Sequence, residues 1–144
     1  MEMIIVMIIA GLLAALAAPR IGSSLSNLRL NTSARHLAAV LRNTRSKAIA
    51  DKKTYPVVFA PEGNKYSYPG DAKEKEVILP EDVQIKELRD EEGEDIAEAG
   101  QILFFPKGNS SGGRVTMTNE KEQVFYIKVE TISGRVRILR DEDE

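Results

Sequence analysis

The sequence predicts an α+β fold in which one long N-terminal α-helix packs against an antiparallel β-sheet or β-sandwich. Three observations support this prediction: an apolar run at residues 3–18, helical periodicity that continues to about residue 51, and short β-favouring runs from residue 54 onward. The 144-residue length suits one such unit. We therefore divide the chain into a hydrophobic helix (1–19), its amphipathic continuation (20–53) and a β-rich head (54–144).

The apolar run reads MIIVMIIAGLLAALAA and contains no charge and no strong helix breaker before Pro19. A helix of this length extends about 24 Å, while a full bilayer crossing usually takes roughly 20 residues. We expect this segment to lie in lipid or in the core of a helical bundle. A secretory signal peptide is the alternative, but the basic segment that should precede the run is missing, and Glu2 is acidic.

Beyond Pro19 the pattern becomes amphipathic. One stripe contains Ile21, Leu25, Leu28 and Thr32, and an overlapping stripe contains Leu30, Ala34, Leu37, Leu41 and Ala48. This spacing is typical of an α-helix with an apolar face. Because only Pro19 and Gly22 interrupt it, we predict one helix from residue 2 to about 51, kinked or locally melted at these two residues.

From Thr54 onward the helical pattern stops, and short runs rich in β-branched and aromatic residues follow, each bounded by turn residues. The runs are 54–60, 65–68, 76–80, 83–88, 101–105, 114–118, 123–130 and 134–139. We predict six to eight antiparallel strands packed on the amphipathic helix. The acidic segment 90–100 is expected to be a polar surface loop.

The composition excludes several kinds of site. There is no cysteine, so neither a disulfide nor a thiolate metal site can form, and the single histidine, His36, cannot make a histidine metal cluster. We find no nucleophile–base pair, carboxylate constellation or cofactor motif. We therefore expect a protein that is not an enzyme and that holds no cofactor or metal.

Charge is distributed unevenly although the net charge is only −2. Residues 20–53 carry eight Lys or Arg side chains against one carboxylate, and the remainder is acidic. This asymmetry predicts contacts between the basic and acidic parts of neighbouring copies, or a basic face near anionic lipid or nucleic acid. Ordinary solvated surfaces of both signs are the alternative.

Two loops invite ligand-binding interpretations. GNSSGG (108–113) is glycine-rich like a phosphate-binding loop, but it lacks the Lys-Ser ending and precedes an expected strand, so we predict a flexible hairpin loop. The acidic runs 90–95 and 141–144 lack EF-hand spacing and are expected to be solvated rather than to bind calcium.

Three segments together resemble the GspH/FimT family of minor pseudopilins and pilins. EMIIVMIIAGLLAALAAPRI (2–21) looks like the family's N-terminal helix, with a glutamate, a glycine nine residues later and a closing proline. ILFFPKGNSSGGRVTM (102–117) is similar to a passage of the family's head, and ETISGRVRIL (130–139) resembles its C-terminal strand with a Gly-Arg-x-Arg motif.

This resemblance implies a pilin-like fold and a subunit of a type II secretion pseudopilus, which serves protein export across the outer membrane. It implies that Glu2 pairs with the N-terminal amine of a neighbouring subunit, and that Gly11, Pro19 and Gly22 serve helix packing and adjustment during assembly. The implied partners are other pseudopilins or pilins in a helical filament and, before assembly, inner-membrane lipid. The implied location is a single pass in the bacterial inner membrane, with the head in the periplasm.

Family precursors carry a short basic leader that prepilin peptidase removes ahead of the glutamate. In this sequence Met1 immediately precedes Glu2. Prepilin peptidase is therefore an expected partner only if a leader lies upstream.

Two other functions compete with this interpretation. FimT-type members take part in DNA uptake, and their Gly-Arg-x-Arg corresponds to Gly134, Arg135 and Arg137 here, with Arg114 as a possible extension. DNA is thus an alternative partner, although the acidic run that follows Arg140 opposes phosphate binding. A single-pass membrane protein with a sensor-like head is the third interpretation.

Overall fold

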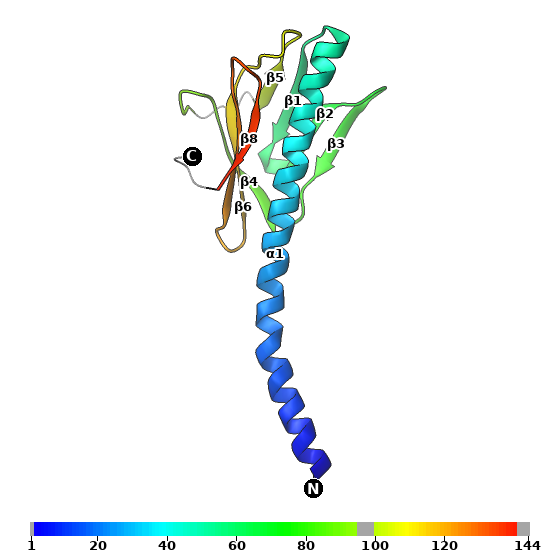
Figure 1. Cartoon of the computed structure of the whole chain (residues 1–144), viewed down its shortest axis with the longest axis vertical. Helices are drawn as coiled ribbons and strands as arrows, with labels where there is room; N and C mark the ends of the chain where they lie inside the picture. The colour runs from blue at the N-terminus through cyan, green and yellow to red at the C-terminus, as the bar shows by residue number, and fades with distance from the viewer. Residues whose placement is uncertain (1, 95–99, 141–144) are drawn as a thin grey trace.

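The computed structural model describes the backbone of residues 2–94 and 100–140, and their side chains except those of residues 2 and 17–23. One long helix, α1 (Glu2–Asp51), leads into a head of eight strands and one short 3-10 helix, η1 (Pro61–Gly63) (Figure 1). The strands are β1 (Tyr55–Ala60), β2 (Lys65–Pro69), β3 (Glu74–Ile78), β4 (Val83–Arg89), β5 (Gln101–Phe104), β6 (Gly113–Asn119), β7 (Val124–Val129) and β8 (Val136–Leu139).

Helix α1 continues through Pro19 and Gly22 without interruption, so the predicted local melting at these residues is wrong. A proline removes one backbone donor and crowds the preceding turn at a cost of about 3 kcal/mol, but the turns on either side keep their own hydrogen bonds. The helix ends where Lys52 adopts a left-handed φ of 54° and the Lys53 N–H donates to the Ala48 carbonyl at 3.2 Å. This is the backbone pattern of a Schellman cap, formed here without glycine.

The eight strands form two four-stranded antiparallel sheets, with the orders β3-β2-β1-β5 and β4-β6-β7-β8. Each run that the sequence predicted as a strand overlaps one of them. The predicted α+β fold, with a long helix on antiparallel sheets, is confirmed. Helix α1 lies beside both sheets along its C-terminal half, while its N-terminal half extends away from the head (Figure 1).

The core lies where α1 meets the two sheets. The second predicted stripe of the helix is fully buried there: Leu30, Ala34, Leu37, Leu41 and Ala48 are each 0% exposed. It packs in one cluster with Val57 and Phe104 of the first sheet and with Met117 and Ile127 of the second. The buried face of the helix therefore completes one hydrophobic core with both sheets, which do not share a strand.

The first predicted stripe has a different role. Leu25 and Leu28 are 47% and 60% exposed, and Thr32 is exposed as well. These side chains lie on a face of the helix that the head does not cover. The amphipathic segment thus has one apolar face for its own head and a second, partly apolar face that is left open.

Polar contacts hold α1 against both sheets. His36 Nδ1 lies 2.8 Å from the Tyr66 hydroxyl of β2, in the first sheet. On the other side, the Arg45 Nε–H donates to the carbonyls of Gly108 (2.9 Å) and Ser133 (3.1 Å), and Arg42 donates to the Val136 carbonyl at 3.1 Å. Two helix arginines therefore satisfy loop and edge-strand carbonyls that the sheet itself leaves unpaired.

The segment 105–112 connects β5 in one sheet to β6 in the other. It also folds back on the end of β5 in the manner of the predicted hairpin loop, because Phe104 and Ser110 form an antiparallel bridge. Backbone bonds from Phe105 to Asn109 and from Ser110 to Thr131 hold it in place, at 2.9 and 2.8 Å. It leads into a strand rather than a helix, so the phosphate-loop alternative is wrong. The predicted polar loop at 90–100 is exposed at 91–94, and residues 95–99 lie outside the described part.

The two faces of α1 should respond differently to the same truncation. Leu37→Ala removes a fully buried side chain, so the free energy of unfolding should fall by about 2–5 kcal/mol. Leu28→Ala removes an exposed one and should change it by less than about 0.5 kcal/mol. Urea denaturation of both variants provides the comparison, and an equal loss in both would contradict this account of the core.

Candidate functional site

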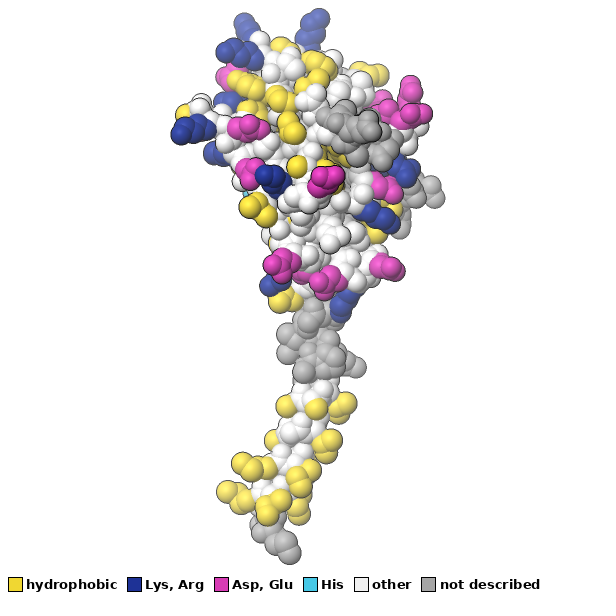
Figure 2. All heavy atoms as spheres, turned by 180° about the vertical axis from the view of Figure 1, so that it is seen from behind, with side chains coloured by type: hydrophobic (Ala, Val, Ile, Leu, Met, Phe, Trp, Pro, Cys, Tyr) yellow, Lys and Arg dark blue, Asp and Glu magenta, His cyan; other side chains and the backbone are white. Residues whose placement is uncertain are grey.

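The N-terminal part of α1 exposes apolar side chains on every side. From Met3 to Leu16 the large apolar residues are between 52% and 83% exposed, and none packs against the described part of the head. Figure 2 shows apolar side chains projecting from both sides of the helix below the head. Soluble monomers rarely present apolar patches of such extent, so this surface marks a contact with other molecules.

Gly11 lies within this surface, and a Cβ atom added to it would meet nothing within 4 Å. The packing of this chain on itself therefore does not require glycine here. A glycine on a helix surface allows the backbone of another helix to approach closely. Glu2, Pro19 and Gly22 have helical backbones, but their side chains lie outside the described set.

Among the residues that the structure describes, no helical stretch is both long and apolar enough to cross a bilayer. The same part of the chain contains no cluster of three or more potential metal ligands. The acidic run 141–144 lies outside the described residues.

Two of the predicted nucleic-acid residues, Arg114 and Arg137, belong to a row of cations that runs across the second sheet. Strand register places Arg89 opposite Arg114, Arg114 opposite Lys128, and Lys128 opposite Arg137. Directly opposed residues point to the same face of a sheet. The neighbouring row, with Leu88, Val115 and Ile127, is buried toward the helix, so the cation row lies on the outer face. We call these four residues the outer cation row.

Carboxylates balance the outer cation row at both ends. Arg137 pairs with Glu130 at 3.2 Å, and Arg89 pairs with Glu87 at 3.0 Å. A hydrogen bond from the Ser133 hydroxyl, together with the nearby charges of Arg137 and Arg135, holds the pKa of Glu130 below its usual range. The Arg114 guanidinium lies 5.7 Å from the centre of the Tyr126 ring. The row is therefore a network of paired charges more than a bare cationic patch.

Arg135 is not a member of the outer cation row by strand register, although its charge lies near Glu130 at the end of the row. It lines a depression with Arg42 and Arg45 of the helix and with residues 133–136. The structure thus brings Arg114 and Arg137 onto one sheet face, but it does not gather all the predicted residues at one point. Sequence reasoning missed Arg89 and Lys128, because their place in the row depends on strand register rather than on any local motif.

Gly134 has a structural role. It adopts a left-handed φ of 63°, and a Cβ atom there would overlap the Gly108 carbonyl oxygen and the Arg45 Nε atom. Its N–H donates to the Glu130 carbonyl at 2.9 Å. The glycine of the Gly-Arg-x-Arg motif therefore allows the tight turn before β8 to pack against the 105–112 segment and the helix.

The profile of the family described as Type II transport protein GspH matches residues 33–138, which is most of the head and of the buried part of α1. The chain belongs to the GspH family. A curated relative, Type II secretion system protein H of Xanthomonas campestris pv. campestris, is 28% identical over 137 residues, covering 95% of this chain and 79% of the relative. The sequence-based prediction of a minor pseudopilin of the type II secretion class is thereby confirmed.

Solved structures agree on the fold. A crystal structure of the minor pseudopilin EpsH from the type II secretion system of Vibrio cholerae superposes with a TM-score of 0.66 at 14% identity, covering 81% of this chain and 96% of EpsH. A second EpsH structure gives 0.63 at 12% identity, covering 78% and 97%. The type IV minor pilin FimU of Pseudomonas aeruginosa gives 0.56 at 11% identity, covering 76% and 87%. At these identities the likeness supports the shared pilin-like fold.

Membership in the GspH family indicates the kind of assembly and the cellular location of this protein. GspH proteins are structural components of the secretion apparatus that assemble with other pseudopilins in a pseudopilus. Their location is the cell envelope, facing the periplasm. Both agree with a chain whose described surface combines a folded head with an unpartnered apolar helix.

Substitutions at two glycines of this GspH chain distinguish the cost of backbone strain from the cost of steric overlap. Gly93 has a φ of 86° and no described atom within 4 Å of an added Cβ, whereas Gly134 has a φ of 63° and close neighbours. Gly93→Ala should cost about 1 kcal/mol of unfolding free energy, from the left-handed backbone alone. Gly134→Ala should cost roughly 2–4 kcal/mol, because overpacking adds to that strain. Thermal and urea denaturation measure both, and equal costs would argue against the packing role of Gly134.

Proposed function

We propose that this minor pseudopilin assembles through its exposed N-terminal helix into the pseudopilus of a type II secretion system, which drives protein export across the outer membrane. The observation that carries the proposal is the apolar surface of residues 3–16, which is exposed on all sides and has no partner in the described chain. A bundle of equivalent helices from other subunits would bury it.

The open face of the amphipathic segment supports the same arrangement. Leu25 and Leu28 form a further exposed apolar area near the head, while the opposite face of the same helix packs in the core. A neighbouring helix can therefore follow α1 past the end of the apolar run without displacing the head. Gly11 offers a point of close approach within this contact.

Before assembly, we propose that the helix resides in the inner membrane as a single pass, with the head in the periplasm. A carboxylate in a lipid-embedded helix is unfavourable by about 2.5–3.5 kcal/mol at the bilayer centre. Glu2 is the first residue of the helix, so the cost is smaller there, and a Glu2 that is solvated at the membrane edge is the alternative. Pairing of Glu2 with the N-terminal amine of a neighbouring subunit would remove the remaining cost on assembly and would favour the filament over the free subunit. Prepilin peptidase is a partner if a leader peptide precedes Met1.

Glu2→Leu tests the pairing. Loss of the carboxylate should abolish the preference for the filament, so the amount of the subunit recovered in sheared pseudopili should fall by at least about tenfold. Glu120→Leu is the control, because Glu120 is an exposed carboxylate on the head. Incorporation of Glu2→Leu at the unaltered level would remove the proposed role.

Gly11→Ile tests the close approach of helices. The space around Gly11 is open in the single chain, so the stability of the head should be unchanged. A bulky side chain should nevertheless separate the helices and reduce incorporation, while Gly11→Ala should be tolerated better. If both variants assemble as the unaltered chain does, Gly11 is an ordinary residue of the helix.

DNA binding has narrower support. The outer cation row favours it, but Arg137 and Arg89 are already paired with carboxylates. Phosphate binding would have to displace these pairs. A gel shift at low salt with Arg135→Ala/Arg137→Ala discriminates: DNA binding by the unaltered chain that this variant loses would support the alternative, and no shift at all would dismiss it.

A further inference from the structure

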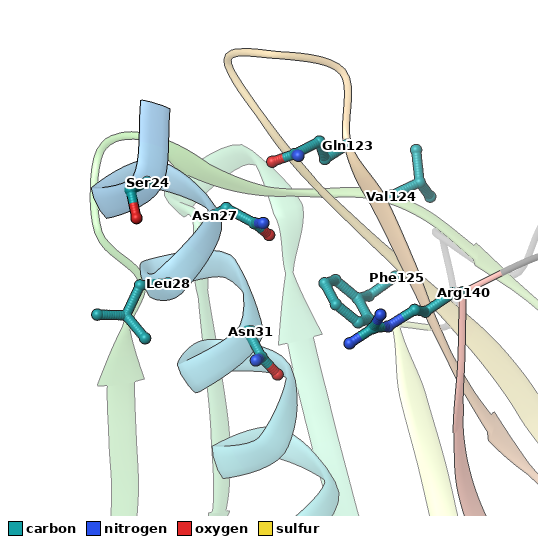
Figure 3. A pocket seen from close by; sticks show the side chains of 8 residues that line it. All are labelled: Ser24, Asn27, Leu28, Asn31, Gln123, Val124, Phe125 and Arg140. Carbon is teal, nitrogen blue, oxygen red and sulfur yellow. The ribbon is translucent and has the colours of Figure 1, made fainter. Parts of the chain in front are cut away.

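A groove runs between α1 and the strands β7 and β8. Its wider end, about 480 Å³ in volume, is lined by Asn27 and Asn31 of the helix and by Phe125 and Arg140 of the head (Figure 3). It continues into a second depression of about 420 Å³ that shares Asn31, Phe125 and Arg140. The groove lies on the head, apart from the apolar surface of residues 3–16 and from the outer cation row.

The lining of the second depression is strongly cationic. Among the residues that the structure describes, Arg35, Arg42 and Arg140 contribute to it and no carboxylate does; the acidic run 141–144, which follows Arg140, lies outside that part. Its apolar part comes from Phe125 and Ile138, and the Arg140 guanidinium lies 5.6 Å from the centre of the Phe125 ring. Arg35 is oriented by a bond from its Nε–H to the Asn31 side chain at 3.0 Å. Several guanidinium groups therefore converge beside a small apolar floor.

Strand β8 presents one backbone edge on the side of this groove. It is the last strand of its sheet, so one row of its N–H and C=O groups points away from β7. The Arg135 carbonyl accepts from the Glu130 N–H on the β7 side, whereas the Val136 carbonyl accepts from Arg42 on the helix side. Because these directions alternate along a strand, the N–H and C=O of Ile138 also point toward the helix side.

We propose that this groove binds an extended, acidic peptide segment of a partner protein. The segment would add to the edge of β8 and pair with the backbone of Ile138. An aliphatic side chain would contact Phe125 and Ile138, and the flanking carboxylates would bind Arg35 and Arg140. Strand addition supplies affinity through main-chain bonds, and the arginines select for acidic sequence.

The geometry favours a peptide over a nucleic acid. Single-stranded nucleic acids bind through several aromatic rings on which successive bases stack. The lining of this groove offers one ring, that of Phe125, and Arg140 already lies over it. A strand edge, in contrast, matches the repeat of an extended peptide.

The test uses the full chain in detergent micelles and a fluorescein-labelled peptide, Glu-Val-Glu-Leu-Glu-Val-Glu. We expect saturable binding by fluorescence anisotropy, and at least about tenfold weaker binding of the peptide in which Gln replaces Glu. Arg35→Gln/Arg140→Gln should weaken binding of the acidic peptide by at least about tenfold as well. Amide signals of Phe125 and Ile138 should shift on titration.

Lys86→Gln/Lys107→Gln is the matched control, because it removes the same charge at two exposed positions outside the groove and should leave binding unchanged. If the arginine variant folds poorly, Asn31→Asp tests the same point, since it puts a carboxylate into the groove and should weaken binding. The proposal is overturned if the acidic peptide fails to bind or if the control loses binding equally. Displacement of bound peptide by a short single-stranded DNA that binds more tightly would overturn it too.

Discussion

The burial of one face of α1 against two separate sheets is the constraint on which the rest of the structure depends. The sheets share no strand, and the helix stripe from Leu30 to Ala48 fills the space between them. Because that face is committed to the head, the opposite face remains open at Leu25 and Leu28. The same helix can thus be the centre of a folded head and the contact surface of a subunit.

Local pattern was enough to predict the elements of this fold. The apolar run, the stripe beginning at Leu30 and the turn-bounded β runs each reflect a periodicity that a few residues establish. The sequence could not say which stripe would be buried, because Leu28 and Leu30 are equally apolar and only the arrangement of the sheets separates them. Likewise, the segment 105–112 carries turn residues whether it joins neighbouring strands or crosses between sheets.

The candidate sites were predicted less completely, for a related reason. A motif such as Gly-Arg-x-Arg shows which residues are close in sequence, whereas a surface depends on partners from distant segments. Strand register places Arg114 and Arg137 in one row on the outer sheet face, with Lys128 between them. Arg135, only two residues from Arg137, instead lines a depression beside the helix. The helix arginines Arg42 and Arg45 looked like members of a solvated basic face, and their bonds to loop and strand carbonyls became visible only in three dimensions.

The two sheets are interleaved in sequence at β4 and β5: β1, β2, β3 and β5 belong to one sheet, while β4, β6, β7 and β8 belong to the other. The chain therefore crosses from one sheet to the other and back again before either sheet is complete. Such interleaving adds contacts between segments that are distant in sequence, which slows folding and couples the loss of one sheet to the loss of the other. A tensile load that reaches the head through α1 would consequently meet a single cooperative unit rather than two layers that peel apart in turn.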